Sequence, residues 1–541
     1  MNSIQSTPVF KPIKFIASLV LLFSVSFSGH AQLFDTRATT QKFNSAFQLI
    51  SMAYVDSVDH EYLTEVAIRE MLKELDPHSV YMTKEEIRRA NEPLMGRFEG
   101  IGVQFQIFRD TIMIISPVPG GPSDKLGILA GDKIVKINGE EATGSKINNN
   151  YVMERLRGTR GTEVTVSIYR YGLKDLLDFT IVRDRIPVYS IDATYMVSPE
   201  TGYIRLNRFS RTTMNEFRES LANLSSQGMQ HLILDLRNNS GGFLDVAVDL
   251  ADEFLDRDKM IVYTEGLRSP RQEFKATSRG NLHKGKLIVL INEGSASASE
   301  IVAGAVQDWD RGLVMGRRSF GKGLVQRPFN LPDSSVIRLT TARYFTPSGR
   351  SIQKPYDEGV AEYRKDLQKR LEHGELIYAD SIHFPDSLRY LTNNKRLVYG
   401  GGGIMPDIFL PIDTLGTSDY YSRLSRRGAI NSFTLDYMNN NRRQLETKYT
   451  TEDGFINEFV VDDDFMESFI EHAEKEGVER DEEGLQASGD HIRVMLKAFI
   501  GRNLFDLNIY YRIVSDVDRE LQQAIQTMSD DTAFKNMLVS N

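Results

Sequence analysis

The pattern of apolar and polar positions changes along this chain, and each change predicts a different kind of domain. Residues 40–92 carry apolar side chains at helical spacing. The next region, 96–185, instead holds short strand-like runs joined by turns, such as 100–108 and 111–118. We therefore expect an N-terminal helical segment over 32–95, followed by a small strand-rich domain.

From residue 186 onward, short and almost wholly apolar runs alternate with amphipathic helical patterns. The most continuous runs lie at 232–236, 287–291 and 312–316. Runs without polar alternation are typical of strands buried on both faces of a parallel sheet, with helices crossing between them. The pattern predicts an α/β core domain over 186–411.

The last part of the chain, 412–541, is predicted to be a mostly helical extension. Apolar residues repeat at helical spacing around 504–528, and acidic patches occur at 462–464 and near 479–483. We expect one last helix over 504–528, with a packed apolar side and a solvated acidic face. The pattern does not indicate what this extension does.

The segment LDPHSVYM at 75–82 interrupts the helical pattern, because Pro77 disfavours helix at Asp76. His78 raises the question of a metal site, but no second ligand lies at metal-ligand spacing from it. We expect a structural turn here.

Residues 1–31 match the pattern of a secretory signal. Lys11 and Lys14 form a positive region, 15–28 is mostly apolar, and Gly29-His30-Ala31 has small residues where a signal peptidase cuts. An uncleaved anchor is the alternative, but the apolar run is shorter than the about 20 residues that span a bilayer. The sequence predicts cleavage directly after that tripeptide and export, to the periplasm.

Composition narrows the functional classes. The chain has 541 residues, 41% hydrophobic and 26% charged, which is typical of globular proteins with sizeable cores. Its net charge is −9 and no basic stripe is present, so nucleic acid is not expected as the main partner. The chain has no cysteine, which excludes disulfides, thiolate metal sites and a cysteine nucleophile.

The strand-rich domain resembles a PDZ domain. The segment LGILAGDKIVKING at 126–139 carries the resemblance, together with Gly100, Ile101, Gly102 and Val103, which fit the carboxylate-binding loop. Glycines leave backbone N–H groups free to hold a C-terminal carboxylate, and the adjoining strand edge can pair with an extended peptide. The alternative is a small β-domain with an ordinary glycine turn. The resemblance implies a PDZ domain over 96–185.

Three polar loops follow the three apolar runs of the core. They are NNSGG at 238–242, GSASAS at 294–299 and RRSFGKG at 317–323. If the strands are parallel, their carboxyl ends meet at one edge of the sheet, where ligand chemistry concentrates in α/β folds. The sequence therefore predicts that these loops share one site.

Ser297 is the candidate nucleophile, because it stands where a strand gives way to a helix. A helix N-terminus offers unpaired N–H groups and the positive end of a dipole, which suit a developing oxyanion. The Ala298 N–H is one expected donor, and the backbone at Gly241 or Gly242 is the second. Such donors stabilise a transition state by about 3–4 kcal/mol each. The alternative is a serine that only caps the helix.

Lys322 is the candidate base, since no histidine lies in a partner motif and G-x-S-x-G is absent from this site. A free lysine has a pKa near about 10.4, but burial and nearby positive charge can lower it by several units. Arg317 and Arg318 would contribute if they point inward, and Gln326 could orient the amine. The alternative is a surface lysine in a glycine turn.

A nucleotide site is the rival interpretation of the lysine loop. Residues 316–322 match the first seven positions of a Walker A motif, but Gly323 stands where Ser or Thr would bind Mg²⁺. Pro328 then lies in a strand-like run where a helix should follow. We do not expect nucleotide binding.

Together these segments resemble the C-terminal processing peptidases, a tail-specific family of serine proteases, over about residues 40–411. The matching segments are YVD at 54–56, LDPHSVYM at 75–82, the PDZ segment, DLRNNSGG at 235–242, GSASASEIVAGAVQD at 294–308, GKGLVQ at 321–326 and YGGGGIMPD at 399–407. The resemblance implies an α/β, crotonase-like protease core with an inserted PDZ domain that captures substrate C-termini. It assigns Ser297 as nucleophile, Lys322 as base and Gln326 as the third member of a Ser-Lys-Gln arrangement, with no cofactor or metal.

Two regions depart from the family pattern. A glutamate and a threonine often precede the Phe-Gly-Lys-Gly step in the family, whereas this chain has Arg317-Arg318-Ser319. Residues 412–541 have no assigned counterpart, and docking of an adaptor, homo-oligomerisation or packing on the core are the alternatives for them. The expected function is an exported endopeptidase acting on proteins with unstructured C-termini. The alternative is a non-catalytic PDZ scaffold or chaperone built on a protease-like core.

Overall fold

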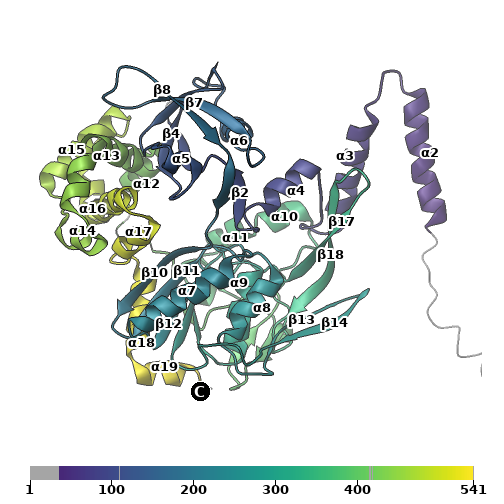
Figure 1. The fold of residues 1–541 in the computed structure, drawn as a ribbon. Coiled ribbons are helices and arrows are strands. Elements are labelled where there is room, and N and C mark those ends of the chain that lie inside the picture. Colours follow the sequence, from purple (N-terminus) through teal and green to yellow (C-terminus); the bar gives the residue numbers. More distant parts are fainter. Residues whose placement is uncertain (1–35, 109, 414–415, 417, 540–541) are drawn as a thin grey trace, which may run out of the picture. The chain divides into compact units, whose positions relative to one another are not determined.

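The computed structural model describes residues 36–108, 110–413, 416 and 418–539 (Figure 1). The chain divides into two compact units, one up to Met71 and one from Leu72 onward. The predicted signal segment, 1–31, lies outside the described residues. Among the helices that are described, none combines the length and apolar character needed to cross a membrane.

The first unit is helical, as predicted. It contains α2 (Arg37–Ala53) and most of α3 (His60–Lys73). The ring of Phe47 on α2 contacts that of His60 on α3, with 5.8 Å between ring centroids. No residue of α2 is buried, and the apolar side chains Leu49 and Met52 are exposed.

The second unit begins with α4 and a PDZ-like sheet. Thr83 caps α4 (Lys84–Asn91) in a capping box with Glu86. The sheet has the strand order β3-β4-β5-β7-β8, with β6 beside β5, and β2 pairs with β9 where the chain enters and leaves it. The elements are β2 (Arg97–Gly100), β3 (Val103–Phe108), β4 (Thr111–Pro117), α5 (Pro122–Lys125), β5 (Lys133–Ile137), β6 (Glu140–Glu141), α6 (Asn149–Leu156), β7 (Glu163–Tyr169), β8 (Leu177–Val182) and β9 (Asp184–Pro187).

The core sheet has the order β10-β11-β12-β15-β16-β21. Its strands are β10 (Ile191–Ser198), β11 (Thr201–Leu206), β12 (His231–Asp235), β15 (Leu287–Ile291), β16 (Leu313–Gly316) and β21 (Ile408–Phe409). Strands β11 to β21 run parallel to their neighbours, and only β10 is antiparallel. The prediction that the three most apolar runs are parallel neighbours is therefore confirmed.

Side chains of the core sheet alternate between two packed faces. Leu232, Leu234 and Val289 pack with α7 (Thr213–Ser226), α8 (Leu244–Asp252) and α9 (Ala298–Asp308). Ile233 and Ile288 point to the other face, which α18 (Arg519–Ser529) and α19 (Asp531–Met537) cover (Figure 1). Burial on both faces explains why these strands lack polar alternation.

A second, antiparallel sheet lies beside the lysine loop, with the order β1-β18-β13-β14 and β17 on the free side of β18. Its strands are β1 (Val80–Met82), β13 (Met260–Gly266), β14 (Ser269–Lys275), β17 (Leu324–Asn330) and β18 (Val336–Phe345). The 75–82 segment was expected to be only a turn. Its last three residues instead form β1, because Val80 to Met82 pair with β18, a contact between residues distant in sequence.

Between β18 and the C-terminal helices the chain forms short elements. They are α10 (Val360–Arg364), α11 (Asp366–Glu372), the 3-10 turns η1 (Ala379–Ser381) and η2 (Asp386–Leu388), and the hairpin strands β19 (Arg389–Leu391) and β20 (Leu397–Tyr399). The charged segment 357–373 therefore contains two short helices.

The C-terminal extension is helical, but its last part is not one helix. The helices are α12 (Asp419–Arg427), α13 (Ala429–Lys448), α14 (Glu452–Glu458), α15 (Asp463–Lys475), α16 (Glu482–Leu504) and α17 (Leu507–Val514), followed by α18 and α19. The single helix predicted over 504–528 is wrong, because Asp506 and Asp518 each accept hydrogen bonds from backbone N–H groups and start new helices there. Leu435 of α13 packs against Met113 and Ile115 of the PDZ sheet.

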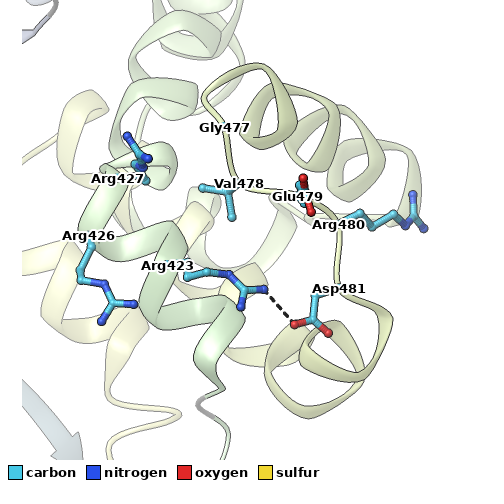
Figure 2. A pocket seen from close by; sticks show the side chains of 8 residues that line it. All are labelled: Arg423, Arg426, Arg427, Gly477, Val478, Glu479, Arg480 and Asp481. Carbon is cyan, nitrogen blue, oxygen red and sulfur yellow. Dashed lines mark hydrogen bonds and ion pairs between the residues drawn. The ribbon is translucent and has the colours of Figure 1, made fainter.

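A surface cavity of about 840 Å³ lies between α12 and the loop after α15. Figure 2 shows Arg423 reaching across it to Asp481, at 2.9 Å, while Arg426 points away from Asp481. None of the predicted site residues lines this cavity. This cavity is therefore separate from the predicted site.

Candidate active site

The serine and glycine loops contact each other at the carboxyl ends of β12 and β15. Gly241 has φ +100°, and a Cβ built on it would lie 2.9 Å from Ser297 Cβ and 3.0 Å from the Ala298 nitrogen. Only glycine allows this approach without a clash. The Phe320 N–H donates to the Ser295 carbonyl at 2.9 Å, which joins the lysine loop to the same place. The three predicted loops therefore meet.

Ser297 has a strained backbone at the start of α9. Its φ is 55° and its ψ −110°, in a region that non-glycine residues rarely occupy. Ser297 and Glu300 are placed as a capping box, in which the Ser297 N–H donates to Glu300 at 2.7 Å, but among the described residues Ser297 Oγ forms no hydrogen bond. The simple capping role therefore does not account for Ser297, whose hydroxyl is available for other chemistry.

The expected oxyanion donors differ in availability. The Gly241 N–H donates to Asn239 Oδ1 at 2.9 Å, so in this arrangement it is occupied. In the part of the chain that the structure describes, neither the Gly242 nor the Ala298 N–H has a hydrogen-bond acceptor. Of the predicted donors, Ala298 and Gly242 are therefore free, while Gly241 shapes the loop against Ser297.

Glu300 connects the serine loop to the lysine loop. Its carboxylate accepts hydrogen bonds from the Ser297 N–H (2.7 Å), the Lys322 N–H (2.9 Å), the Gly321 N–H (2.7 Å) and the Ser319 hydroxyl (2.5 Å). Burial raises the pKa of Glu300, while these four donors oppose the shift. One carboxylate thus fixes the backbones of both candidate catalytic residues.

Tyr344 on β18 supports the same two backbones from their carbonyl side. Its hydroxyl lies 3.1 Å from the Ser297 carbonyl and also within hydrogen-bond distance of the Lys322 carbonyl. The Tyr344 side chain is 2% exposed, so this contact is shielded from water. Ser297 and Lys322 are therefore held from both sides by buried polar groups.

The Lys322 ammonium lies in an environment that favours its neutral form. Burial, and next to it the positive charge of Arg338, lower the pKa of Lys322, while Glu300 and Asp76 oppose the shift. Arg338 has no ion-pair partner among the described residues, so no carboxylate neutralises its charge. No hydrogen bond joins Lys322 Nζ to Ser297 Oγ within the described chain, so the dyad is not closed in this structure.

The expectation that Arg317 and Arg318 influence Lys322 is wrong. Arg317 donates to Glu293 at 2.8 Å and also pairs with Glu520, while Arg318 pairs with Glu375 at 2.6 Å. Both guanidinium groups are therefore occupied by carboxylates. The cation that acts on Lys322 is Arg338, which lies on β18, the strand paired with the one that follows the lysine loop.

Among the described residues, no hydrogen bond joins Gln326 to Lys322. It lies on β17, and its Nε2 donates to Thr340 Oγ1 at 3.3 Å. The Thr340 N–H donates to Ser79 Oγ at 3.1 Å, and Ser79 Oγ donates to Asp76 Oδ2 at 2.6 Å. The orienting role of Gln326 stays a prediction.

The 75–82 segment, expected to be only structural, borders the site. Burial, and then the charge of Lys322, lower the pKa of His78 to about 4, so its ring is neutral at neutral pH. His78 Nε2 lies 2.8 Å from the Tyr363 hydroxyl. The sequence did not predict that this segment lies near Lys322, because no local sequence pattern indicates that β1 pairs with β18.

The PDZ loop residues lie at the mouth of an apolar groove. The carbonyls of Ile101 and Gly102 accept from Ser123 and Val118, at 3.1 and 2.9 Å. For the N–H groups of Ile101 and Gly102, the described residues provide no acceptor. A cavity of about 80 Å³ adjoins this loop, lined by Phe98, Ile101, Gly102, Val103, Phe105, Val152, Met153, Leu156 and Arg157. Free donors beside an apolar groove suit a peptide C-terminus.

Four family models match this chain. The S41 peptidase family matches 200–362, the PDZ domain 100–181, and the N-terminal domain of the activating protease CtpB 25–86. A family of unknown function, DUF8443, matches 420–506.

The chain is also similar to individual proteins. A carboxy-terminal-processing protease of Bartonella bacilliformis is 37% identical over 351 residues, which are 63% of this chain and 80% of that protein. A probable CtpA-like serine protease of Staphylococcus aureus is 36% identical over 320 residues, 58% of this chain and 63% of that protein. A solved photosystem II D1 C-terminal processing protease is 29% identical, over 59% of this chain and 95% of that one, with a TM-score of 0.33. On the match to the Bartonella protein, this chain belongs to the S41 peptidase family, as a serine peptidase of the carboxy-terminal-processing type with a PDZ domain.

Proposed function

We propose that this chain cleaves peptide bonds through an acyl-enzyme on Ser297, with Lys322 as general base. The observation that carries the proposal is the shared support of the two residues. Glu300 holds both N–H groups, and the Tyr344 hydroxyl lies against both carbonyls. The free Ser297 hydroxyl and the lowered pKa of Lys322 suit a nucleophile and a base.

In the first step, Ser297 Oγ attacks the scissile carbonyl carbon while neutral Lys322 Nζ takes the hydroxyl proton. The N–H groups of Ala298 and Gly242 would hold the oxyanion. The lysine ammonium then protonates the leaving amine, and the peptide bond breaks. Water hydrolyses the ester with the same base, which restores Ser297. Gln326 would orient the amine after leaving Thr340.

The PDZ groove would select the substrate by its C-terminus. Ile101 and Gly102 offer free N–H groups to a carboxylate, and the apolar lining suits an apolar last side chain. We propose that unfolded proteins with apolar C-termini bind here and feed their chains to Ser297.

A pair of synthetic peptides tests this capture. Both carry the same cleavable sequence and the same apolar C-terminus, which is a free carboxylate in one and an amide in the other. Losing hydrogen bonds to a charged group costs about 1.5–3 kcal/mol, so kcat/KM should fall roughly 10- to 100-fold for the amide. The change should be in KM, because the amide alters capture and not chemistry. Equal kcat/KM values for the two peptides would contradict capture by carboxylate.

We also propose that the protein is exported after removal of residues 1–31. The support is the sequence of this segment, with its positive start, apolar centre and small residues before the predicted cleavage point. Mass spectrometry of the N-terminal peptide of the protein purified from its own cells should show Gln32, or the pyroglutamate formed from it, as the first residue. A first residue within 1–31 would contradict the proposed cleavage.

A further inference from the structure

The C-terminal helix α18 begins beneath the edge of the core sheet that carries the candidate active site. Its N-cap, Asp518, accepts from the Leu521 N–H at 3.0 Å, which fixes the start of the helix. Leu521 and Met528 then pack into the apolar cluster on the second sheet face. The two carboxylates at this helix start, Asp518 and Glu520, are therefore placed by packing further along the helix.

These carboxylates bind two arginines that lie at the ends of core strands. Arg237 donates to Asp518 at 2.9 and 2.7 Å, and to Glu520 Oε2 at 2.9 Å. Glu520 Oε1 pairs in turn with Arg317. The side chains of Arg237, Arg317 and Glu520 are 9%, 6% and 11% exposed, so water screens these pairs weakly.

Each partner in this network lies at the base of a different loop of the site. Arg237 directly precedes the glycine loop 238–242, and Arg317 begins the lysine loop 317–323. Arg317 also donates to Glu293 at 2.8 Å, shortly before Ser297. Glu520 is thus the carboxylate through which the glycine loop and the lysine loop are linked on this side of the sheet.

We infer that Glu520 is a positioning residue for the peptidase reaction, which sets the distance between the oxyanion donors and the base by bridging Arg237 and Arg317. The inference rests on the proposed roles of Ser297 and Lys322. Glu520 does not touch the reacting atoms. It acts through the two loops, in which a displacement of about 1 Å can lower a rate by about 100-fold.

The ion pairs of Glu520 are better explained by the placement of the two loops than by a contribution to the stability of the fold. A buried ion pair often adds little net stability, because desolvation of the charges offsets their attraction. Each arginine would also keep a carboxylate without Glu520, since Arg237 retains Asp518 and Asp235, and Arg317 retains Glu293. A Glu520→Gln protein should therefore fold, with the link between the two loops weakened.

The chain offers a matched control on the same helical segment. Asp531, at the start of α19, pairs with Lys286, which directly precedes β15 at the amino end of the strand. This pair ties the C-terminal helices to the opposite edge of the sheet. Asp531→Asn removes one ion pair of the docked segment and leaves the catalytic edge unchanged.

The test measures kcat, KM, thermal unfolding and the rate of labelling by a fluorophosphonate, in the wild type, Glu520→Gln and Asp531→Asn. Glu520→Gln should lower kcat and the labelling rate about 10- to 100-fold with KM nearly unchanged. Asp531→Asn should leave kcat, KM and the labelling rate near the wild-type values. Glu520→Asp, which keeps the charge but is too short to bridge both arginines, should fall between wild type and Glu520→Gln.

Two results would overturn the inference. One is a folded Glu520→Gln protein whose kcat and labelling rate stay within twofold of the wild type. The other is an equal loss in Glu520→Gln and Asp531→Asn, which would show that docking of the helices alone matters. If Glu520→Gln does not fold, the same comparison is made with Glu520→Asp. A wild-type protein that is active but labelled elsewhere than Ser297 would instead overturn the proposed function.

Discussion

Ser297→Ala is expected to abolish cleavage of an unfolded protein substrate, with a fall in kcat of about 10⁴-fold or more. The variant should fold normally, because Ser297 Oγ forms no hydrogen bond among the described residues, and alanine keeps the backbone N–H that donates to Glu300. Initial rates on the same substrate, together with thermal unfolding of both proteins, check the expectation.

The neighbouring serines provide the control for this change. Ser299 Oγ donates to the Asn239 carbonyl and Ser295 Oγ to the Leu236 carbonyl, both at 2.8 Å. Ser299→Ala removes one of the two hydrogen bonds to the buried Asn239 carbonyl, which keeps the Ala296 N–H, so it should destabilise the protein by about 0.5–1.5 kcal/mol. It should retain far more activity than Ser297→Ala. Substantial activity in folded Ser297→Ala would remove Ser297 from the mechanism.

Lys322→Met is expected to lower kcat by about 10²- to 10⁴-fold, because a general base contributes that much to a rate. Methionine keeps most of the apolar stem and removes the amine. In the wild type, kcat should rise with pH until Lys322 is neutral. Burial and Arg338 lower the pKa of Lys322, so this rise should lie below the range of a free lysine. Steady-state rates across pH measure both effects.

The Arg338→Met variant tests the direction in which Arg338 shifts the pKa of Lys322. Removing this cation raises the pKa of Lys322, so the rising limb should move to higher pH by up to about one unit. At neutral pH the rate should then fall by up to about tenfold and recover in more alkaline buffer. If the rise of kcat with pH does not shift in Arg338→Met, or if it is still present in Lys322→Met, a group other than Lys322 titrates.

Much of the fold was predictable because its signals are local. Runs such as 287–291 are apolar at every position, which is expected only for a strand covered on both faces. The parallel order of β12, β15 and β16 follows from such strands with helices between them, and it brings Gly241 and Ser297 together. The family resemblance then assigned the residues.

The residues that hold or influence the serine and lysine loops could not be predicted in the same way. Tyr344 and Arg338 reach the loops from β18, and Glu520 reaches them from a C-terminal helix, but no motif around Ser297 or Lys322 indicates these contacts. Glu300 is the exception, because Ser297 and Glu300 have the spacing of a capping box. That spacing indicates a helix start, but not that the same carboxylate also holds the lysine loop.

The structure explains the sequence Arg317-Arg318-Ser319, which differs from the family pattern before the Phe-Gly-Lys-Gly step. Ser319 donates to Glu300 and accepts from the Ile404 N–H at 2.6 Å, so it fastens the lysine loop. Arg317 and Arg318 bind carboxylates away from Lys322. The part of the extension formed by α18 and α19 packs on the core, one of the three alternatives that the sequence left open.

The most direct test of the central claim is peptide mapping by mass spectrometry after reaction with a fluorophosphonate. We expect a single adduct per chain, on Ser297, which forms faster as pH rises through the pKa of Lys322 and much more slowly in Lys322→Met. An adduct on another residue, or labelling of Ser297 at the same rate in Lys322→Met, would contradict a serine nucleophile activated by this lysine.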